Sequence, residues 1–121
     1  MPLEPTAVVW ERMGDVTVLG FVVSRVTEID YAKKSTDELT ELADRFGGKM
    51  LFSLGNVTFM SSVGISILVT FNQEIQARGG QLKVCDIRPM LREVFHSIEL
   101  DKAIDLYHSK QQALLAFSSE Q

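Results

Sequence analysis

Apolar and polar residues recur along this chain with two different periods, which predict strands and helices in alternation. Runs that are rich in β-branched residues, or short and continuously apolar, are typical of strands. The predicted strands span 7–12, 16–23, 50–54, 82–85 and 103–107. Met13-Gly14-Asp15 separates the first two, so we expect these strands to form a hairpin.

Helical spacing occupies the intervals between the later strands. The first apolar stripe consists of Leu39, Leu42, Ala43 and Phe46, at i, i+3, i+4 and i+7. Ser35 and Glu38 precede it with the spacing of a capping box, so Ser35 is predicted to cap this helix. The residues 24–34 show no clean period and are predicted to form a surface loop.

Three further helices follow from the same pattern. The helix predicted over 62–78 has one apolar face, made of Gly64, Ile67, Leu68, Phe71 and Ile75. Pro89 suits the first position of the next helix, because its missing N–H would have no helical partner there. The stripe of that helix consists of Leu91, Val94, Phe95 and Ile98. Ser109 is predicted to cap a last helix that runs to residue 117.

The order of elements is therefore β-β-α-β-α-β-α-β-α, which predicts an α/β fold. Strands that are connected through helices lie parallel, whereas a hairpin is antiparallel. We therefore expect a mixed β-sheet of about five strands with helices packed on it. The 121 residues suit one domain over 1–121. The residues expected in its core include Trp10, Phe21, Phe46, Phe52, Phe71 and Phe95.

The composition argues against a nucleic-acid-binding, membrane-inserted or secreted protein. The chain is 45% hydrophobic and 23% charged, as soluble globular proteins are, and its net charge of −4 argues against nucleic acid as a partner. No apolar run approaches the roughly 20 residues that span a bilayer, and the N-terminus lacks the pattern of a signal peptide. Cys85 is the only cysteine, which suits a reducing compartment. We expect a cytoplasmic protein without membrane insertion.

Catalytic chemistry finds little support in the residue pattern. Cys85 lies inside a predicted strand, where a free cysteine is usually buried and inert. His96 and His108 are not placed by any motif beside a nucleophile, although a hydrolase that uses Cys85 or Ser62 remains a third hypothesis. The chain has no Gly-rich phosphate loop and no cluster of metal ligands. We therefore expect neither an enzyme nor a cofactor.

The pair Ser61-Ser62, where an apolar run becomes a helix, allows two interpretations. A serine there is a favoured helix cap, because its oxygen accepts a hydrogen bond from a free N–H of the first turn. A serine there is also a suitable phosphorylation site, because the helix N-terminus favours negative charge. The residue pattern leaves both interpretations open.

Three stretches make the chain resemble the STAS domain family of bacterial anti-sigma-factor antagonists, over residues 16–117. "LFSLGNVTFMSSVGISIL" resembles the strand, loop and helix around that family's phosphorylated serine. "GGQLKVCDIRPMLREVFHSIELDKAIDLY" resembles the elements that follow, and "SKQQALLAF" resembles its terminal helix. The family motif is Asp-Ser-Ser-Gly, and alignment on Gly64 places Ser61 at the aspartate, Ser62 at the phosphorylated serine and Val63 at the second serine. Ser53 stands where the family often has another aspartate, so both acidic neighbours are predicted to be missing here.

The resemblance implies a phospho-switched binding protein. Its unphosphorylated form would bind an anti-sigma factor with serine-kinase activity and so release a sigma factor. Phosphorylation of Ser62 would switch binding off, and a PP2C-type phosphatase would reverse it. The expected contact surface consists of Asn56, Thr58, Met60, Ser61, Ser62, Val63 and Ile65, with a contribution from 24–30. The alternative is a non-switching STAS subunit of a signalling scaffold or of a lipid-transport complex.

Overall fold

A five-stranded sheet with the spatial order β1-β2-β4-β6-β7 forms the centre of the computed structural model, which describes residues 6–119. Its strands are β1 (Val8–Met13), β2 (Val16–Phe21), β4 (Lys49–Ser53), β6 (Gln81–Cys85) and β7 (Asp105–Leu106). A separate two-stranded sheet pairs β3 (Arg25–Val26) with β5 (Phe59–Met60). The helices are α1 (Ile29–Phe46), α2 (Ser62–Ala77), α3 (Pro89–Ser97) and α4 (Lys110–Ser119), with a 3₁₀ turn at Leu100–Lys102.

The strand directions confirm the predicted mixed sheet. β1 and β2 are antiparallel, in a continuous register from Val8 opposite Phe21 to Met13 opposite Val16. Gly14, in the tight turn between them, has a φ of +63°, a conformation that glycine adopts without strain. The remaining neighbours in this sheet are parallel, as crossover connections through helices require.

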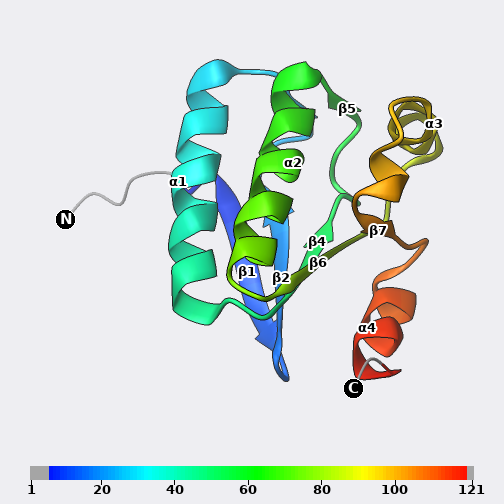
Figure 1. The fold of residues 1–121 in the computed structure, drawn as a ribbon. Coiled ribbons are helices and arrows are strands. Elements are labelled where there is room, and N and C mark those ends of the chain that lie inside the picture. Colours follow the sequence, from blue (N-terminus) through cyan, green and yellow to red (C-terminus); the bar gives the residue numbers. More distant parts are fainter. Residues whose placement is uncertain (1–5, 120–121) are drawn as a thin grey trace.

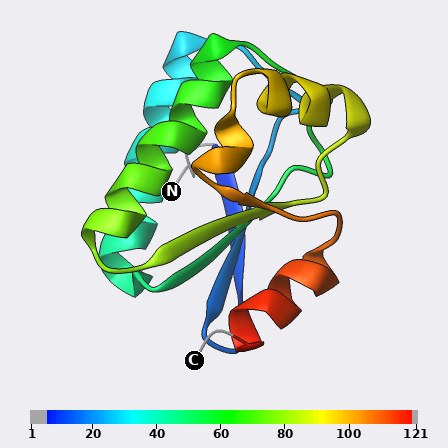
Figure 2. The same ribbon diagram turned by 45° about the vertical axis from the view of Figure 1, so that its right-hand side comes forward.

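Helices cover the two faces of the sheet unequally (Figures 1 and 2). α1 and α2 lie side by side on one face, and the larger core lies beneath them around Phe52, Phe71 and Leu68. α4 lies on the other face and buries a smaller cluster that includes Val18, Leu51 and Phe117. The sheet is thus sandwiched between helices, and the amino end of α2 emerges at the end of the molecule where α3 also lies.

Two predictions about the start of α1 are wrong. Residues 24–34 are not a loop, because they form β3 and the first turns of α1, which begins at Ile29. Ser35 does not cap the helix: it is buried within it, and its hydroxyl donates to the carbonyl of Tyr31 at 2.8 Å. No side chain caps the helix at Glu28.

Tertiary contacts replace the expected capping box. Instead of reaching back to the backbone of Ser35, the Glu38 carboxylate accepts hydrogen bonds from the N–H groups of Ala7 and Val8 at 2.9–3.0 Å. The Tyr31 hydroxyl donates to the carbonyl of Ala7, and its ring centroid lies 6.0 Å from that of Phe21. The first half of α1 is therefore held by the start of β1 rather than by a local cap.

The other helix predictions are confirmed, with one exception. Pro89 opens α3, and the Ser109 hydroxyl caps α4 by accepting from the N–H of Gln112 at 3.1 Å. Leu91 and Phe95 of α3 are buried as expected, but Val94 and Ile98, the residue that follows α3, are exposed. Only half of the predicted stripe faces the core, because α3 lies at the end of the sheet instead of across it (Figure 1).

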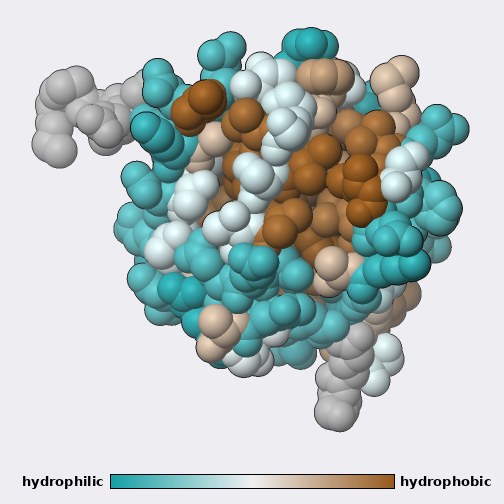
Figure 3. Space-filling view, turned by 45° about the horizontal axis from the view of Figure 1, so that its top comes forward, coloured by the Kyte–Doolittle hydropathy of each residue, from teal (hydrophilic) through white to brown (hydrophobic). Residues whose placement is uncertain are grey.

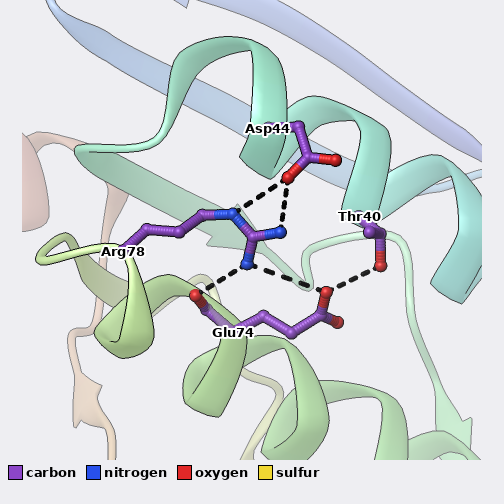
Figure 4. A network of polar contacts seen from close by, with 4 residues as sticks. All are labelled: Thr40, Asp44, Glu74 and Arg78. Atoms are coloured by element: carbon purple, nitrogen blue, oxygen red, sulfur yellow. Dashed lines mark hydrogen bonds and ion pairs between the residues drawn. The ribbon is translucent and has the colours of Figure 1, made fainter.

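A polar network fastens the carboxyl-terminal halves of α1 and α2 together (Figure 4). The Arg78 guanidinium donates to Asp44 at 3.2 Å and to the carbonyl of Glu74 at 2.9 Å. Thr40 donates to the Glu74 carboxylate at 2.7 Å. The network therefore links α1 to α2 at the end of α2 that is remote from Ser62.

Candidate functional site

The approach to α2 is anchored by the two-stranded sheet. The N–H groups of Thr58 and Phe59 donate to the carbonyl of Ser24 at 2.8 and 3.3 Å. The N–H of Ser61 donates to the carbonyl of Val26 at 3.1 Å. The segment 24–30 therefore lies beside the serine pair, and it forms β3 and the start of α1 rather than a loop.

The two serines have different surroundings. Ser61 is the N-cap of α2: its Oγ accepts from the N–H of Val63 at 3.2 Å and donates to the carbonyl of Val26 at 3.4 Å. Ser62 is the first helical residue and is exposed. Among residues 6–119, no hydrogen bond engages its hydroxyl. The capping interpretation therefore applies to Ser61, and the exposed hydroxyl of Ser62 has no part in the cap.

Gly64 lets the first turn of α2 approach β3 closely. A Cβ at this position would lie 2.7 Å from the carbonyl oxygen of Val26 and 3.1 Å from both the Val26 Cβ and the Met60 Cε. A contact of 2.7 Å with a backbone atom requires that the helix or the strand move. Glycine therefore sets the position of Ser62 relative to the two-stranded sheet.

The electrostatics of the first turn favour an anion. The first turn of α2 contains no acidic residue. The free N–H groups and the dipole of a helix N-terminus attract negative charge. A phosphate ester at Ser62 would sit next to these groups without displacing an existing hydrogen bond of its hydroxyl.

A carboxylate that the sequence reasoning missed lies at the end of β4. The Ser53 hydroxyl donates to Asp86 at 2.8 Å, and a Cβ on Gly55 would lie 3.5 Å from that of Asp86. We expected Ser53 to leave this strand end without an acid, but Asp86, which follows β6, supplies one. Because β4 and β6 are parallel neighbours, with Ser53 opposite Cys85, the topology could have indicated this contact.

The residues predicted to contact a partner differ in how much of each side chain solvent can reach. Asn56, Thr58 and Ser62 are exposed, and Ser61, Val63 and Ile65 are half-buried. Met60 is only 4% exposed and belongs to the core, so its side chain offers no contact surface. The Asn56 amide donates to the carbonyl of Phe21 at 3.4 Å, which ties the approach loop to the end of β2.

Exposed apolar side chains surround this end of the molecule (Figure 3). The sequence pattern named Val94 and Ile98 but assigned them to the buried stripe; together with Met90 they recur at i, i+4 and i+8 and form a second stripe that is exposed. The exposed apolar residues here are Phe59 in β5, Ile29 in α1, Met90 and Val94 in α3, and Ile98, which follows α3. An open groove of about 520 Å³ between α1 and α2 is lined by Ile29, Lys33, Val63 and Ser66, among others.

Cys85 is not arranged for nucleophilic catalysis. It is fully buried, and burial, followed by the Asp86 carboxylate, raises the pKa of its thiol to about 12. The thiol therefore stays protonated at neutral pH, whereas nucleophilic cysteines are thiolates. Within residues 6–119, the one hydrogen bond of a histidine side chain joins His96 to Asp101, at 2.9 Å.

Two negative findings apply to the described part of the chain. None of its helices combines the length and the apolar character that crossing a bilayer requires. No group of three or more histidine, cysteine, aspartate or glutamate side chains between residues 6 and 119 is arranged to hold a metal ion.

Comparison with known proteins agrees with this geometry. The sequence profile of the STAS domain matches residues 14–113. The chain belongs to the STAS domain family. BtrV of Bordetella bronchiseptica, a STAS relative whose proposed role is anti-sigma factor antagonism, is 24% identical over 88 residues, 73% of this chain and 76% of BtrV.

Solved structures show the same STAS fold. The anti-sigma-factor antagonist (STAS) domain protein of Planctomyces limnophilus is 26% identical, with a TM-score of 0.80 over 92% of this chain and 97% of that protein. The anti-sigma factor antagonist SpoIIAA, in its unphosphorylated form, has a TM-score of 0.70 at 12% identity, over 95% of this chain and 100% of SpoIIAA. The phosphorylated form of Bacillus SpoIIAA gives a TM-score of 0.69 at 14% identity, over 92% and 99% of the two chains. At these identities the SpoIIAA likeness concerns the fold.

Proposed function

We propose that this STAS protein is an anti-sigma factor antagonist that is switched by phosphorylation of Ser62. Its unphosphorylated form binds an anti-sigma factor with serine-kinase activity and so releases a sigma factor. The kinase phosphorylates Ser62 and ends the complex, and a PP2C-type phosphatase restores binding. The observation that carries this proposal is the exposed hydroxyl of Ser62, which opens α2 and is free of the capping role of Ser61.

The contact surface of the proposal is centred on Ser62. It combines the polar approach residues Asn56 and Thr58 with the half-buried Val63 and Ile65. To these we add the exposed apolar residues Phe59, Met90, Val94 and Ile98, which give the surface the apolar content that a stable interface core requires. Figure 3 shows that apolar surface gathers at this end of the molecule.

Phosphorylation acts on this surface through charge and desolvation. A phosphate adds about −1.5 to −2 charges at pH 7, and an interface closed over Ser62 would have to remove water from it. An unpaired buried charge costs several kcal/mol, and each 1.4 kcal/mol weakens binding tenfold. Because the helix N-terminus holds the phosphate in place, the fold itself remains intact while the surface changes.

The decisive experiment uses the full chain with a purified anti-sigma-factor kinase and ATP. Mass spectrometry should find one added phosphate, on Ser62. Calorimetry should show that Ser62→Ala retains kinase binding and that Ser62→Asp loses it by at least about a hundredfold. The matched control is Gln111→Glu, which adds the same single negative charge on α4, on the far face of the sheet, and should bind normally.

The alternative function predicts the opposite results. A non-switching STAS subunit of a scaffold or of a lipid-transport complex would incorporate no phosphate at Ser62 and would form a stable large assembly that phosphatase does not change. The half-buried Val63, at the position of the family's second serine, favours this alternative. Equal binding by Ser62→Asp and Ser62→Ala would rule out the phospho-switch.

A further inference from the structure

The edge strand β1 exposes an unusual amount of apolar surface. It has a neighbour on one side only, because β1 ends the sheet order. Val9 is 54% exposed, and Trp10 and Met13 are each 41% exposed, although Trp10 was expected in the core. Exposed apolar edge strands are sites where a further strand can pair.

The backbone of β1 is ready for such pairing between Val9 and Met13. The carbonyl of Ala7 accepts from the N–H of Val22, so it points toward β2. Since these groups alternate in direction along a strand, the N–H and C=O groups of Trp10 and Arg12 point away from β2, toward the open edge. At Val8 the outward N–H is already bound by Glu38, so α1 closes the edge there.

The strand lacks several of the features that natural proteins use to block an edge. Its register with β2 is continuous over six residue pairs, without a bulge. It contains no proline and no lysine. It carries one acid and one base, Glu11 and Arg12, so two copies of the strand do not repel each other through net charge.

We propose that β1 is a homodimer interface, where β1 of a second copy pairs antiparallel and extends the sheet. Because Glu38 closes the edge at Val8, the open residues Val9–Met13 must pair among themselves, which places the two-fold axis at Glu11. In this register Trp10 of each copy exchanges backbone hydrogen bonds with Arg12 of the other. Val9 lies opposite Met13 of the second copy.

The proposed register brings side chains of the two β1 strands together on each face of the extended sheet. Trp10 and Arg12 share the face under α1, where Phe46 already contacts both: its ring centroid lies 5.3 Å from that of Trp10 and 4.4 Å from the Arg12 guanidinium carbon. An arginine stacks well on an indole, so the new Trp10–Arg12 pairs suit this face. On the other face Val9 and Met13 form apolar pairs, and the two Glu11 side chains meet as the one unfavourable pair.

Sedimentation equilibrium of the full chain, from micromolar to millimolar concentration, tests this interface. The parent should dimerise reversibly. Val9→Lys should weaken the dimer at least about tenfold, because it places a charge against Met13 of the second copy. Leu115→Lys, on α4, is the matched control: Leu115 is also an exposed apolar residue, and its change should leave the dimer unaffected.

Two more variants test the register itself. The double variant Val9→Lys/Met13→Glu should restore dimerisation, because each lysine then lies opposite a glutamate of the second copy. Glu11→Gln should tighten the dimer about twofold to fivefold, because it removes the like-charge pair at the axis. Thermal unfolding of each variant verifies that the fold is retained.

The outcomes separate cleanly. A chain that stays monomeric at millimolar concentration overturns the proposal. So does a dimer that Val9→Lys leaves intact, since it must use another surface, or a double variant that stays as weak as the single one. An extended peptide of another protein bound at this edge, in place of a second copy, would also overturn it. None of these results bears on Ser62, which lies at the amino end of α2 and not on the β1 edge.

Discussion

Replacing Gly64 by alanine tests whether the close approach of α2 to β3 positions Ser62. The added Cβ would lie 2.7 Å from the carbonyl oxygen of Val26, well inside van der Waals contact, and 3.1 Å from the Met60 Cε. A methionine end can move, but the carbonyl belongs to the β3–β5 ladder, where Val26 also accepts from the N–H of Ser61. The first turn of α2 must therefore shift away from β3.

The expected cost follows from two opposing effects. Overpacking of this kind destabilises a protein by about 1–3 kcal/mol. Alanine inside a helix recovers up to about 1 kcal/mol relative to glycine. We therefore expect Gly64→Ala to lower the free energy of unfolding by about 1–2 kcal/mol, despite the better helix propensity of alanine.

Urea unfolding followed by circular dichroism measures this difference. Gly20→Ala is the matched control, because a Cβ on Gly20 would meet Val9 at 3.5 Å and Ser53 at 3.7 Å, which are ordinary contacts. Gly20→Ala should change the free energy of unfolding little. If Gly64→Ala is as stable as the parent or more stable, the close approach does not constrain the site and our account of Gly64 is wrong.

Three further outcomes are expected from the same unfolding assay. Ser61→Ala should lower the free energy of unfolding by about 1 kcal/mol, because it removes the cap of α2. Ser62→Ala should change that free energy by no more than about 0.5 kcal/mol. Equal effects of the two substitutions would contradict the division of roles between the serines. Glu38→Gln should lose about 1–3 kcal/mol, because an amide replaces the charged acceptor of the Ala7 and Val8 N–H groups, and an unchanged midpoint would contradict this. Burial raises the pKa of the Cys85 thiol from 9.0 to about 12, so above about pH 9 the unfolded chain loses a proton that the native protein keeps. The parent should therefore lose stability relative to Cys85→Ala between about pH 9 and pH 12 and match its pH dependence below about pH 8; parallel curves throughout would refute the shift.

Local sequence patterns were sufficient to predict a helix or turn wherever its structure depends on residues a few positions apart. The stripes that predicted α2, from Gly64 to Ile75, are buried in the structure. The hairpin turn at Gly14 and the start of α3 at Pro89 also follow from residues a few positions apart. Backbone conformation and the burial of one face depend on neighbours in sequence, so the sequence contains that information directly.

Local patterns failed where a distant segment supplies the partner. Glu38 has the spacing of a capping box, yet its carboxylate binds the backbone of Val8, 30 residues away. Asp86 reaches Ser53 across 33 residues, and no periodicity indicates that contact. The distant partners of Glu38 and Ser53 come within reach only when β1, β4 and β6 have taken their places in the folded protein. The charge-assisted hydrogen bonds to these partners are then stronger than the local contacts that the sequence pattern suggests.

The sequence by itself determined the alternation of strands and helices, the mixed sheet, and a serine pair at the start of a helix. Only the tertiary structure decided that Ser61 caps α2 while Ser62 is free, that α1 begins at Ile29, and that half of the α3 stripe faces outward. Periodicity states that a side of a helix is apolar, but not whether protein or solvent covers it. That depends on the packing of segments remote in sequence, which the chain reaches only when folded.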